Sequence, residues 1–182
     1  MKAIGKVVSE MPSDSLPIPK TDFINLVQLC LDFESFTFND VEYVQHQGLA
    51  MGSPLSPVAA CLYMEMLEHD HFEEVMGNDS YWMRYVDDVL VITPGDTDLE
   101  DKLARLNEVD PKIQFTLEKE DNMSLPFLDT LIMRTEDGLK FKVYRKRTNK
   151  EDYIHFHSAH SNRVKSGVVI GFYLRAYRIC SE

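Results

Sequence analysis

The chain has 182 residues, of which 44% are hydrophobic and 27% are charged, and its formal net charge is −11. This length suits one globular domain with a substantial core. No apolar run approaches the length that spans a bilayer, and no charged start followed by an apolar stretch marks a secretory signal. We therefore expect an intracellular protein without a membrane partner, in which the three widely spaced cysteines are reduced.

Charge is unevenly distributed along the chain. Residues 139–182 contain ten Lys or Arg against three Asp or Glu, whereas the first 138 residues contain nine against 27. A basic segment can meet phosphates while an acidic segment holds divalent cations or faces solvent. Composition alone leaves open whether this segregation is functional or accidental.

The N-terminal third predicts a leader, a helix and a hairpin. Residues 1–20 show no clear periodicity and contain three prolines, which favours a poorly ordered leader. We expect an amphipathic helix next, because apolar residues recur there at helical spacing: Phe23, Leu26, Val27, Cys30 and Leu31. Residues 34–46 predict a hairpin that turns at Asn39-Asp40.

A loop with glycines and prolines, residues 47–57, precedes the next predicted helix. Ser53-Pro54 and Ser56-Pro57 each offer a capping hydroxyl followed by proline at the first helical position. The helix should run to about Met76, where Gly77 and Asn78 end it.

The remaining segments alternate between strands and helices. Residues 81–92 predict a second hairpin, Thr97 can cap a short helix, and residues 113–118 alternate as a strand. Residues 127–134 and 139–146 predict a third hairpin around Asp137-Gly138, and residues 163–180 a basic helix. Helices mixed with antiparallel hairpins imply an α+β domain.

Two adjacent carboxylates, Asp87 and Asp88, lie at the tip of the second predicted hairpin, between apolar strands. Neighbouring carboxylates repel each other, and a divalent cation removes that repulsion. Oxygen ligands of this kind suit magnesium, and phosphoryl transfer by two metal ions uses such a cluster. Acidic pairs are also common in solvated turns, so the pair by itself does not decide between these readings.

The loop at residues 47–57 adds a second chemical signal. Glycines allow the backbone to approach a ligand closely, and a helix N-terminus offers unpaired N–H groups to phosphate or sugar oxygens. A simple helix cap with two tight turns is the alternative. The order and spacing of the loop and the aspartate pair are more specific than either feature alone.

Together these segments resemble reverse transcriptases. Tyr85-Val-Asp-Asp88 is similar to the polymerase Y-x-D-D motif, and residues 47–57 are similar to the Q-G…G-S-P loop. The closer resemblance is to Penelope-like retroelement reverse transcriptases. It rests on these strings: Gly48 to Pro57, Met64-Glu65, Arg84 to Asp88, Leu125 to Asp129, Val143 to Lys146 and Arg175 to Cys180.

The resemblance implies a partial right-hand polymerase palm, with an antiparallel sheet and helices packed on one face, followed by the start of a helical thumb. Residues 1–20 would be the leader, 21–150 the palm and 151–182 the start of the thumb. The implied reaction is RNA-directed DNA synthesis from deoxynucleoside triphosphates on an RNA template and a DNA primer. Two Mg²⁺ ions would serve in the complete enzyme, and Mn²⁺ could replace them.

The resemblance also assigns residues. Asp87 and Asp88 would be the catalytic metal ligands, with Asp87 the more essential. The nucleotide-binding set would be Gln47, Gly48, Gly52, Ser53 and Tyr85, the last near the primer end. The basic residues that meet the nucleic-acid backbone would be Lys142, Arg145, Lys146, Arg163 and Lys165. The basic run that begins at Arg145 also fits a nuclear localisation patch, so we expect a nuclear protein.

One catalytic acid of the family pattern is missing from this sequence. A complete site needs another Asp from an earlier strand; Asp14 lacks apolar alternation around it, and Asp22 lies at the predicted helix. We therefore expect this chain alone to be inactive and the full-length protein to contain the fingers and the remaining thumb. The alternative is a non-catalytic nucleic-acid-binding remnant of a retroelement polymerase.

Overall fold

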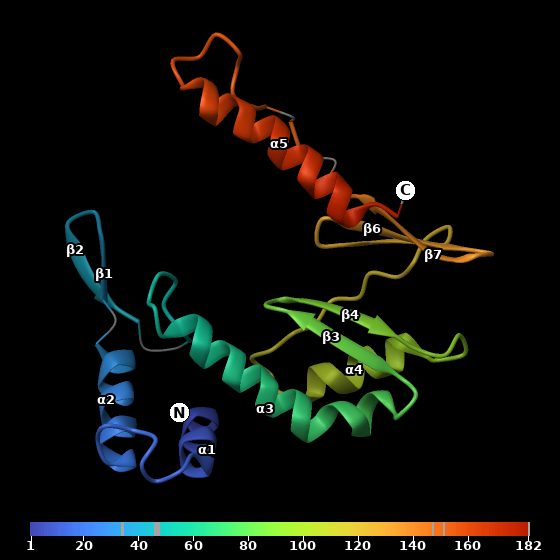
Figure 1. Cartoon of the computed structure of the whole chain (residues 1–182). Helices are drawn as coiled ribbons and strands as arrows, with labels where there is room; N and C mark the ends of the chain where they lie inside the picture. Colours follow the sequence, from blue (N-terminus) through green and yellow to red (C-terminus); the bar gives the residue numbers. More distant parts are fainter. Residues whose placement is uncertain (34, 46–47, 147, 151, 182) are drawn as a thin grey trace. The chain divides into compact units, whose positions relative to one another are not determined.

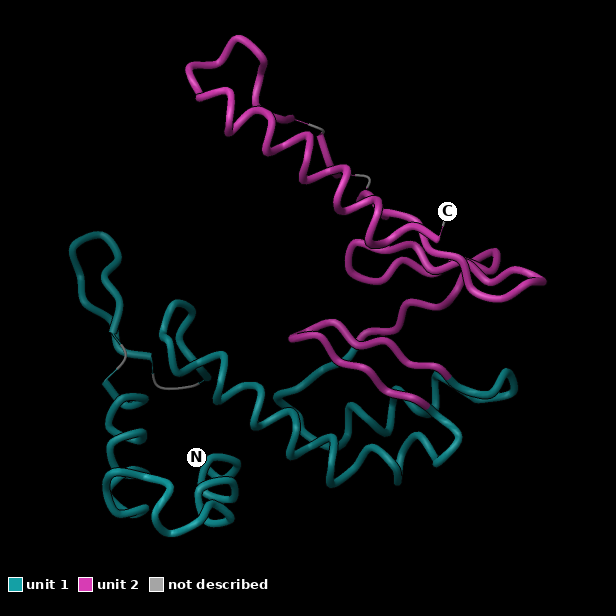
Figure 2. Tube along the Cα trace, in the orientation of Figure 1, with its two compact units in different colours: residues 1–80, 93–115 teal, residues 81–92, 116–182 magenta. Residues whose placement is uncertain are grey.

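The computed structural model of the chain describes residues 1–33, 35–45, 48–146, 148–150 and 152–181. They divide into two units (Figure 2), unit 1 with residues 1–80 and 93–115 and unit 2 with residues 81–92 and 116–182. Within these described ranges the chain forms five helices and seven strands (Figure 1), which confirms a mixed α and β structure. The strands form three small antiparallel sheets instead of one continuous sheet.

Three of the helices of unit 1 pack around one core: α1 (Lys2–Glu10), α2 (Lys20–Asp32) and α3 (Ser56–Met76). Their core consists of Ile4, Val8, Val27 and Ala59, all buried. Other apolar side chains pack against it: Leu16, Phe23, Ile24, Leu31, Leu49, Leu55 and Leu62. Removal of these side chains from water is the main force that holds the three helices together.

The prediction of a poorly ordered leader is wrong for residues 2–10, because they form α1. Ile4 and Val8 lie four residues apart and therefore share one face of the helix, which is buried. A helix of nine residues with an internal glycine is marginal by itself and depends on tertiary packing. The prolines at positions 12, 17 and 19 belong instead to the connection between α1 and α2.

Helix α2 confirms the predicted amphipathic helix, although its buried face is narrower than expected. Phe23, Val27 and Leu31 face the core as predicted, whereas Leu26 and Cys30 are exposed. After α2, strands β1 (Ser35–Phe38) and β2 (Val41–Val44) form the first predicted hairpin. Asn39 and Asp40 have φ angles of 49° and 60°, the pattern of a two-residue type I′ turn.

Helices α3 and α4 (Leu99–Val109) confirm two further predictions, with corrections at their starts. Helix α3 has no side-chain cap, so the predicted capping role of the serine hydroxyls is wrong. It ends as predicted at Gly77, whose φ of 85° is readily adopted by glycine. The cap of α4 is Asp98 instead of Thr97, since the Asp98 carboxylate accepts from the Asp101 N–H at 3.1 Å.

A tyrosine joins α3 to the end of α4. The Tyr63 hydroxyl donates a hydrogen bond to the Asp110 carboxylate. This bond is the largest cause of the lowered pKa of Asp110 and of the raised pKa of Tyr63. Because the folded state lowers the pKa of Asp110, the stabilisation is present above the unfolded pKa of about 3.9 and is lost as the pH falls through the folded value.

Tyr63→Phe is therefore expected to lower the midpoint of thermal unfolding at pH 7 by about 2 °C. The difference from the wild type should begin to shrink as the pH falls below about 4, the pKa of an unfolded Asp, and should vanish below the lowered pKa of folded Asp110. Circular dichroism melts across this pH range measure both effects. Tyr43→Phe is the control, since the Tyr43 hydroxyl bonds to no residue that the structure describes; an equal shift in both variants would contradict the assignment.

Unit 2 contains two sheets and one long helix. Strands β3 (Tyr81–Tyr85) and β4 (Asp88–Ile92) form the second predicted hairpin. Strands β5 (Ser124–Phe127), β6 (Thr130–Thr135) and β7 (Gly138–Val143) form an antiparallel sheet in this order. The β6–β7 hairpin confirms the third predicted hairpin. The strand predicted over residues 127–134 starts only at Thr130, because Leu128, at an unusual φ of 54°, and Asp129 form the turn between β5 and β6.

The strand predicted at residues 113–118 is wrong, because this segment belongs to none of the strands that the described residues form. Its main chain bonds instead to one side chain of α4. The Phe115 N–H donates to Asn107 Oδ1 at 2.6 Å, and Asn107 Nδ2 donates to the Phe115 carbonyl at 3.1 Å. The Asn107 side-chain amide thus takes the main-chain hydrogen bonds that a neighbouring strand was predicted to make.

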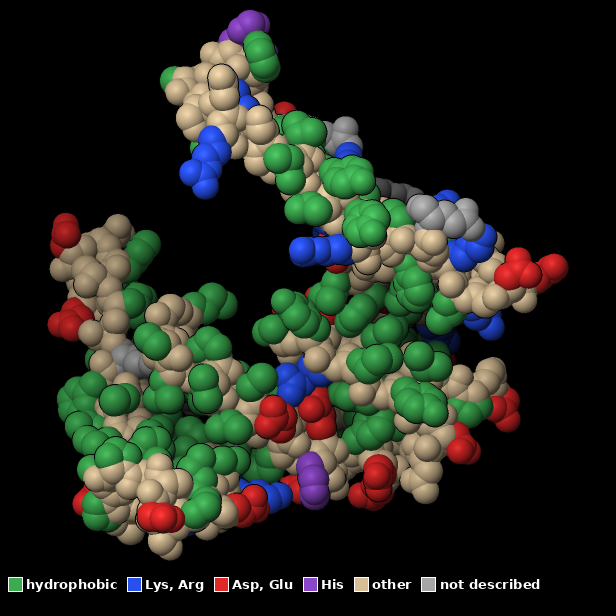
Figure 3. Space-filling model, in the orientation of Figure 1, with side chains coloured by type: hydrophobic (Ala, Val, Ile, Leu, Met, Phe, Trp, Pro, Cys, Tyr) green, Lys and Arg blue, Asp and Glu red, His purple; other side chains and the backbone are tan. Residues whose placement is uncertain are grey.

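Helix α5 (Asn162–Ile179) confirms the predicted C-terminal helix and packs against β7 within unit 2. After it, the Ser181 N–H donates to the Phe141 carbonyl at 3.1 Å, and the Phe141 N–H donates to Ser181 Oγ at 2.8 Å. These two bonds fix the end of α5 to β7. Apolar side chains gather along α5 in Figure 3, and Val169, Tyr173 and Tyr177 are among the exposed ones. No helix in the described ranges has the length and hydropathy required to cross a membrane.

Candidate active site and nucleic-acid interface

The aspartate pair lies at the tip of the β3–β4 hairpin. Tyr85 pairs with Asp88 at the end of the ladder, so Val86 and Asp87 form a two-residue turn. Both aspartates are exposed, as is Tyr85. The half-buried residues Val89 and Leu90 follow directly on β4. The ladder therefore holds two adjacent carboxylates on a short, hydrogen-bonded support.

The turn carries an unusual backbone conformation. Val86 has a φ of 57°, which is a rare outlier for a β-branched residue. Val86 is the first of the two central residues of this turn, and the φ of the second, Asp87, is not positive. This is the pattern of a type II′ turn, in which glycine is favoured at the first central position. Arg84 Nη1 donates to the Val86 carbonyl at 3.4 Å and supports this conformation. Strain of this kind tends to collect at functional sites.

Val86→Gly is expected to stabilise the hairpin by about 1 kcal/mol, because glycine adopts this φ without the clash of a Cβ atom. Little packing should be lost, since Val86 is 69% exposed. The thermal midpoint should rise by about 2–4 °C. Val86→Ala retains the Cβ atom and is the control; equal stability of the glycine and alanine variants would show that Val86 is not strained.

The glycine loop belongs to unit 1 and leads into α3. Gly48 and Gly52 have φ angles of 79° and 100°, which residues with a side chain rarely adopt. A Cβ at Gly48 would also meet Gln45 Nε2 at 3.3 Å. Ser53 is half-buried, and its N–H donates to the Ala50 carbonyl at 3.4 Å. Both glycines are thus required by the turns of this loop, while the predicted nucleotide-binding residue Gln47 lies outside the described residues.

The predicted nucleic-acid contacts lie in unit 2. Lys142 and Arg145 are exposed and line a cavity beside α5, and Lys146 is exposed next to them. Arg163 is exposed in the first turn of α5. Lys165 has local partners instead: its Nζ donates to the Phe156 carbonyl at 2.5 Å and lies 5.6 Å from the centroid of the Phe156 ring.

Comparison with known families decides the class of protein. The family described as reverse transcriptase (RNA-dependent DNA polymerase) matches residues 11–121, more than half of the chain. The chain belongs to the reverse transcriptase family. The matched region contains the glycine loop and the aspartate hairpin, and it begins ahead of residue 21, where the palm was predicted to start. Enzymes of this family use template and primer nucleic acids, deoxynucleoside triphosphates and divalent metal ions.

A second family, described as an animal helix-turn-helix domain, matches residues 152–182. In the part of this segment that the structure describes, α5 is the single helix. The match thus gives a weak indication of nucleic-acid binding next to the reverse transcriptase region. No curated protein and no solved structure gives a significant match to the chain.

The carboxylate oxygens of Asp87 and Asp88 in this reverse transcriptase chain fit part of a metal site. Neither Asp87 nor Asp88 forms an ion pair with a side chain in the described ranges. Mg²⁺ is usually held by one or two carboxylates together with substrate phosphates and water, which suits an exposed acidic pair. No group of three or more His, Cys, Asp or Glu side chains converges among the residues that the structure describes. The pair can therefore supply protein ligands only in combination with other groups.

Sequence reasoning missed several side chains beside the predicted basic contacts of this reverse transcriptase. Arg175, Tyr153 and Phe172 line the same cavity as Lys142 and Arg145. Arg175 Nε lies 2.8 Å from Asp129 Oδ2, an ion pair whose angles do not satisfy a hydrogen bond. Asp129 and Arg175 both belong to sequence strings that carry the resemblance to reverse transcriptases. That resemblance was the signal that could have drawn attention to these two residues, but it assigned no role to either side chain.

Proposed function

We propose that this chain is part of the palm of a Penelope-like retroelement reverse transcriptase. The observation that carries the proposal is the pair Asp87 and Asp88, exposed and without an ion-pair partner in the described chain, on a strained hairpin tip inside the matched region. The strings from Gly48 to Cys180 that resemble this subgroup support it further. The reverse transcriptase class itself does not depend on this finer assignment.

Asp87 and Asp88 would hold Mg²⁺, with Asp87 the more essential ligand, and Mn²⁺ could take its place. When bound there, the ions would supply charge neutralisation at the triphosphate and at the attacking oxygen. In the reaction the primer 3′-oxygen forms a bond to the α-phosphorus of the incoming nucleotide, its proton is released, and pyrophosphate leaves. Two exposed carboxylates on a hydrogen-bonded hairpin suit this role because they are positioned before substrate arrives.

The glycine loop contributes to binding of the incoming nucleotide. Gln47, Gly48, Gly52 and Ser53 line the pocket for its sugar, and Tyr85 lies near the primer end. The positive φ angles of the two glycines favour close approach of backbone to a ligand. The N-terminus of α3, which follows the loop, adds unpaired N–H groups suited to phosphate or sugar oxygens.

The basic segment binds the nucleic-acid backbone. Lys142, Arg145, Lys146 and Arg163 are exposed cations, and Lys165 adds charge near Phe156. Residues 21–150 contribute to the palm and residues 151–182 begin a thumb, while fingers and the rest of the thumb belong to the full-length protein. The helix-turn-helix match supports nucleic-acid contact by this segment. The protein acts in the nucleus.

Metal binding at the hairpin tip tests the proposal. Titration of ¹⁵N-labelled protein with Mn²⁺ should broaden the amide signals around Asp87 first, and Asp87→Asn combined with Asp88→Asn should abolish this preference. The β6–β7 turn offers a matched control, because it also places two acids, Glu136 and Asp137, in a two-residue hairpin turn. Equal broadening at both turns would indicate non-selective attraction of cations and would contradict the proposal.

A non-catalytic nucleic-acid-binding remnant is the second candidate. The absence of a third converging acid within the described ranges favours it. Binding of an RNA–DNA hybrid separates the two candidates: a remnant binds through the basic segment with steep salt dependence and is unaffected by Mg²⁺ or by Asp87→Asn. Hybrid binding that gains affinity with Mg²⁺ and loses this gain in Asp87→Asn supports the polymerase palm.

A further inference from the structure

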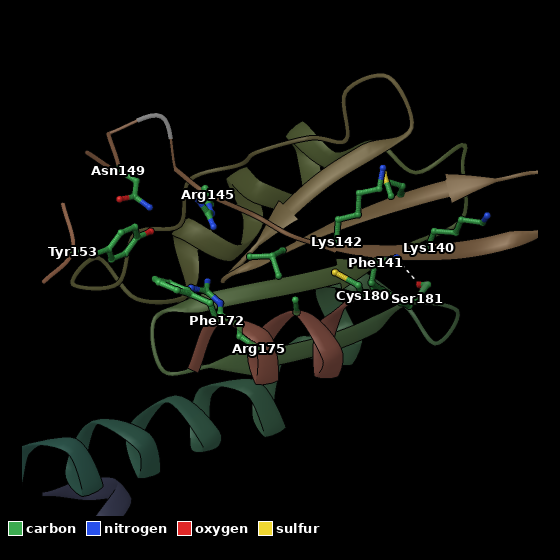
Figure 4. Close-up of a pocket in the computed structure, with 13 residues that line it drawn as sticks. Lys140, Phe141, Lys142, Arg145, Asn149, Tyr153, Phe172, Arg175, Cys180 and Ser181 are labelled. Carbon is green, nitrogen blue, oxygen red and sulfur yellow. Dashed lines mark hydrogen bonds between the residues drawn. The ribbon is translucent and has the colours of Figure 1, made fainter. Parts of the chain in front are cut away.

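Helix α5 packs against the rest of unit 2 through one narrow face. The half-buried residues of this inner face recur at helical spacing: Lys165, Val168, Phe172, Arg175 and Ile179. Phe172 and Arg175 line the cavity against β7 (Figure 4). The Phe172 ring there lies against Arg145 and Tyr153. The inner face of α5 is therefore already occupied by other parts of unit 2.

A second apolar face lies on the opposite side of α5 and is exposed. Four residues there follow the spacing i, i+3, i+4 and i+7, and we call them the outer stripe: Ile170, Tyr173, Leu174 and Tyr177. A rotation of about 100° per residue places Ile170 and Tyr177 opposite Phe172. The Tyr173 and Tyr177 rings stack with centroids 6.3 Å apart and are 68% and 76% exposed. A surface helix normally has a polar face opposite its apolar one, so this second apolar face indicates a binding surface.

The charge around the outer stripe favours an acidic partner. Residues 153–181 contain four Lys or Arg and no Asp or Glu. Arg178 is exposed one helical turn after Leu174, and it forms no ion pair with a side chain in the described part of the chain. Carboxylates that flank an apolar partner surface would therefore meet positive charge here. A second copy of α5 would instead bring like charges together.

The apolar content and the spacing of the outer stripe favour a helix as the partner. Ile170 and Leu174 are aliphatic and gain nothing from phosphate groups, so the backbone of a nucleic acid matches them poorly. Side chains three and four residues apart form the ridges along which helices pack against each other. The match of residues 152–182 to a helix-turn-helix domain points the same way, since that motif pairs two helices and α5 is the single described helix of this segment.

We propose that the outer stripe binds an amphipathic helix of a partner protein, one with acidic side chains beside its apolar face. The apolar face of that helix covers Ile170, Tyr173 and Tyr177, and its carboxylates lie near Arg178. Tyrosine rings that are stacked before binding lose little conformational entropy when they are covered. The outer stripe includes none of the residues proposed to bind metal, nucleotide or nucleic-acid backbone. The inference therefore goes beyond the proposed function and is tested separately from it.

Binding of a designed peptide to the full chain tests the proposal by fluorescence polarisation. The probe is a labelled peptide of about 18 residues, long enough to form a helix, with Leu at spacings of three and four and Glu beside them. The controls are a basic peptide with Lys at each Glu position and a scrambled peptide of the same composition. The acidic peptide is expected to bind saturably, and both controls at least about tenfold more weakly. Equal binding of either control, or no saturable binding of the acidic peptide, would overturn the proposal.

Variants assign the peptide to the outer stripe. Ile170→Ser and Tyr173→Ser are each expected to weaken binding of the acidic peptide at least about tenfold, the effect of losing an interface anchor. Tyr81→Ser is the matched control, because Tyr81 also belongs to unit 2 and is 69% exposed, against 68% for Tyr173. Arg178→Gln should weaken the acidic peptide about threefold, the scale of an exposed ion pair, without weakening the basic one. Circular dichroism melts verify that each variant is folded, and equal binding by Tyr173→Ser and Tyr81→Ser would overturn the site.

Two further measurements separate the partner helix from other occupants of the outer stripe. Sedimentation of the chain alone detects self-association, and a dimer that dissociates in Tyr173→Ser would assign the stripe to a second copy and overturn the proposal. Titration with an RNA–DNA hybrid tests nucleic acid, and weaker hybrid binding by Tyr173→Ser than by Tyr81→Ser would overturn the proposal as well. A monomer whose hybrid binding is equal in these two variants supports a protein partner.

Discussion

Primer extension by this chain is expected to remain at the level of an enzyme-free control. The expectation follows from the family pattern, in which Asp87 and Asp88 provide only part of the required carboxylate set. A misplacement of about 1 Å can cost a hundredfold in rate, and loss of a ligand should cost more. The assay uses an RNA template, a DNA primer, deoxynucleoside triphosphates and either Mg²⁺ or Mn²⁺.

Two comparisons make this result informative. Asp87→Asn should leave the background unchanged, whereas in a longer product of the same gene that extends primers it should lower incorporation by at least about a hundredfold, the scale for loss of a group that stabilises transition-state charge. Glu136→Gln, in the other acidic hairpin turn, should not affect either protein. Clear extension by the 182-residue chain that disappears in Asp87→Asn would refute the expected inactivity.

Val8→Asp is expected to unfold the three-helix core of unit 1. Val8 is 2% exposed and lies among Ile4, Val27 and Ala59. An unpaired carboxylate at this position should cost about 3–5 kcal/mol, which is a large part of the stability of a typical domain. Loss of helical circular dichroism and of a cooperative melt at 25 °C would show this effect.

Ser9→Asp is the matched control, since Ser9 is the next residue of α1 and is exposed. Its melting midpoint should stay within about 2 °C of the wild type, as expected for a surface substitution. The pair of variants also decides whether α1 belongs to the folded unit. If Val8→Asp proved as harmless as Ser9→Asp, residues 2–10 would be the dispensable leader that the sequence alone indicated.

Elements with a local signal could be predicted from the sequence. Turn chemistry located the β1–β2 and β6–β7 hairpins, because Asn39-Asp40 and Gly138 adopt backbone conformations that few residues tolerate. Apolar periodicity located α2, and Gly77 located the end of α3. The aspartate pair was predicted at a hairpin tip for a different reason, because its position follows from the apolar strands on either side.

The errors arose where tertiary contacts replace a local signal. Helix α1 is stabilised by burial of Ile4 and Val8 against α2 and α3, which no nine-residue pattern reveals. Residues 113–118 alternate like a strand, but the Asn107 side chain takes up their main-chain groups. The cavity beside α5 is lined by residues of two separate strings, Val143 to Lys146 and Arg175 to Cys180. Only the fold brings Arg145 of the first string next to Phe172, which lies just before the second.

The β3–β4 hairpin forms a two-stranded sheet among the described residues, so each of its strands lies at an edge of that sheet. Such edges accept a further strand readily, since the new hydrogen bonds form without rearrangement of the existing pair. A strand that adds beside Tyr85 or Asp88 brings its own side chains level with the turn. A single edge pairing could therefore both shield this hairpin from unwanted association and deliver an additional acid next to Asp87.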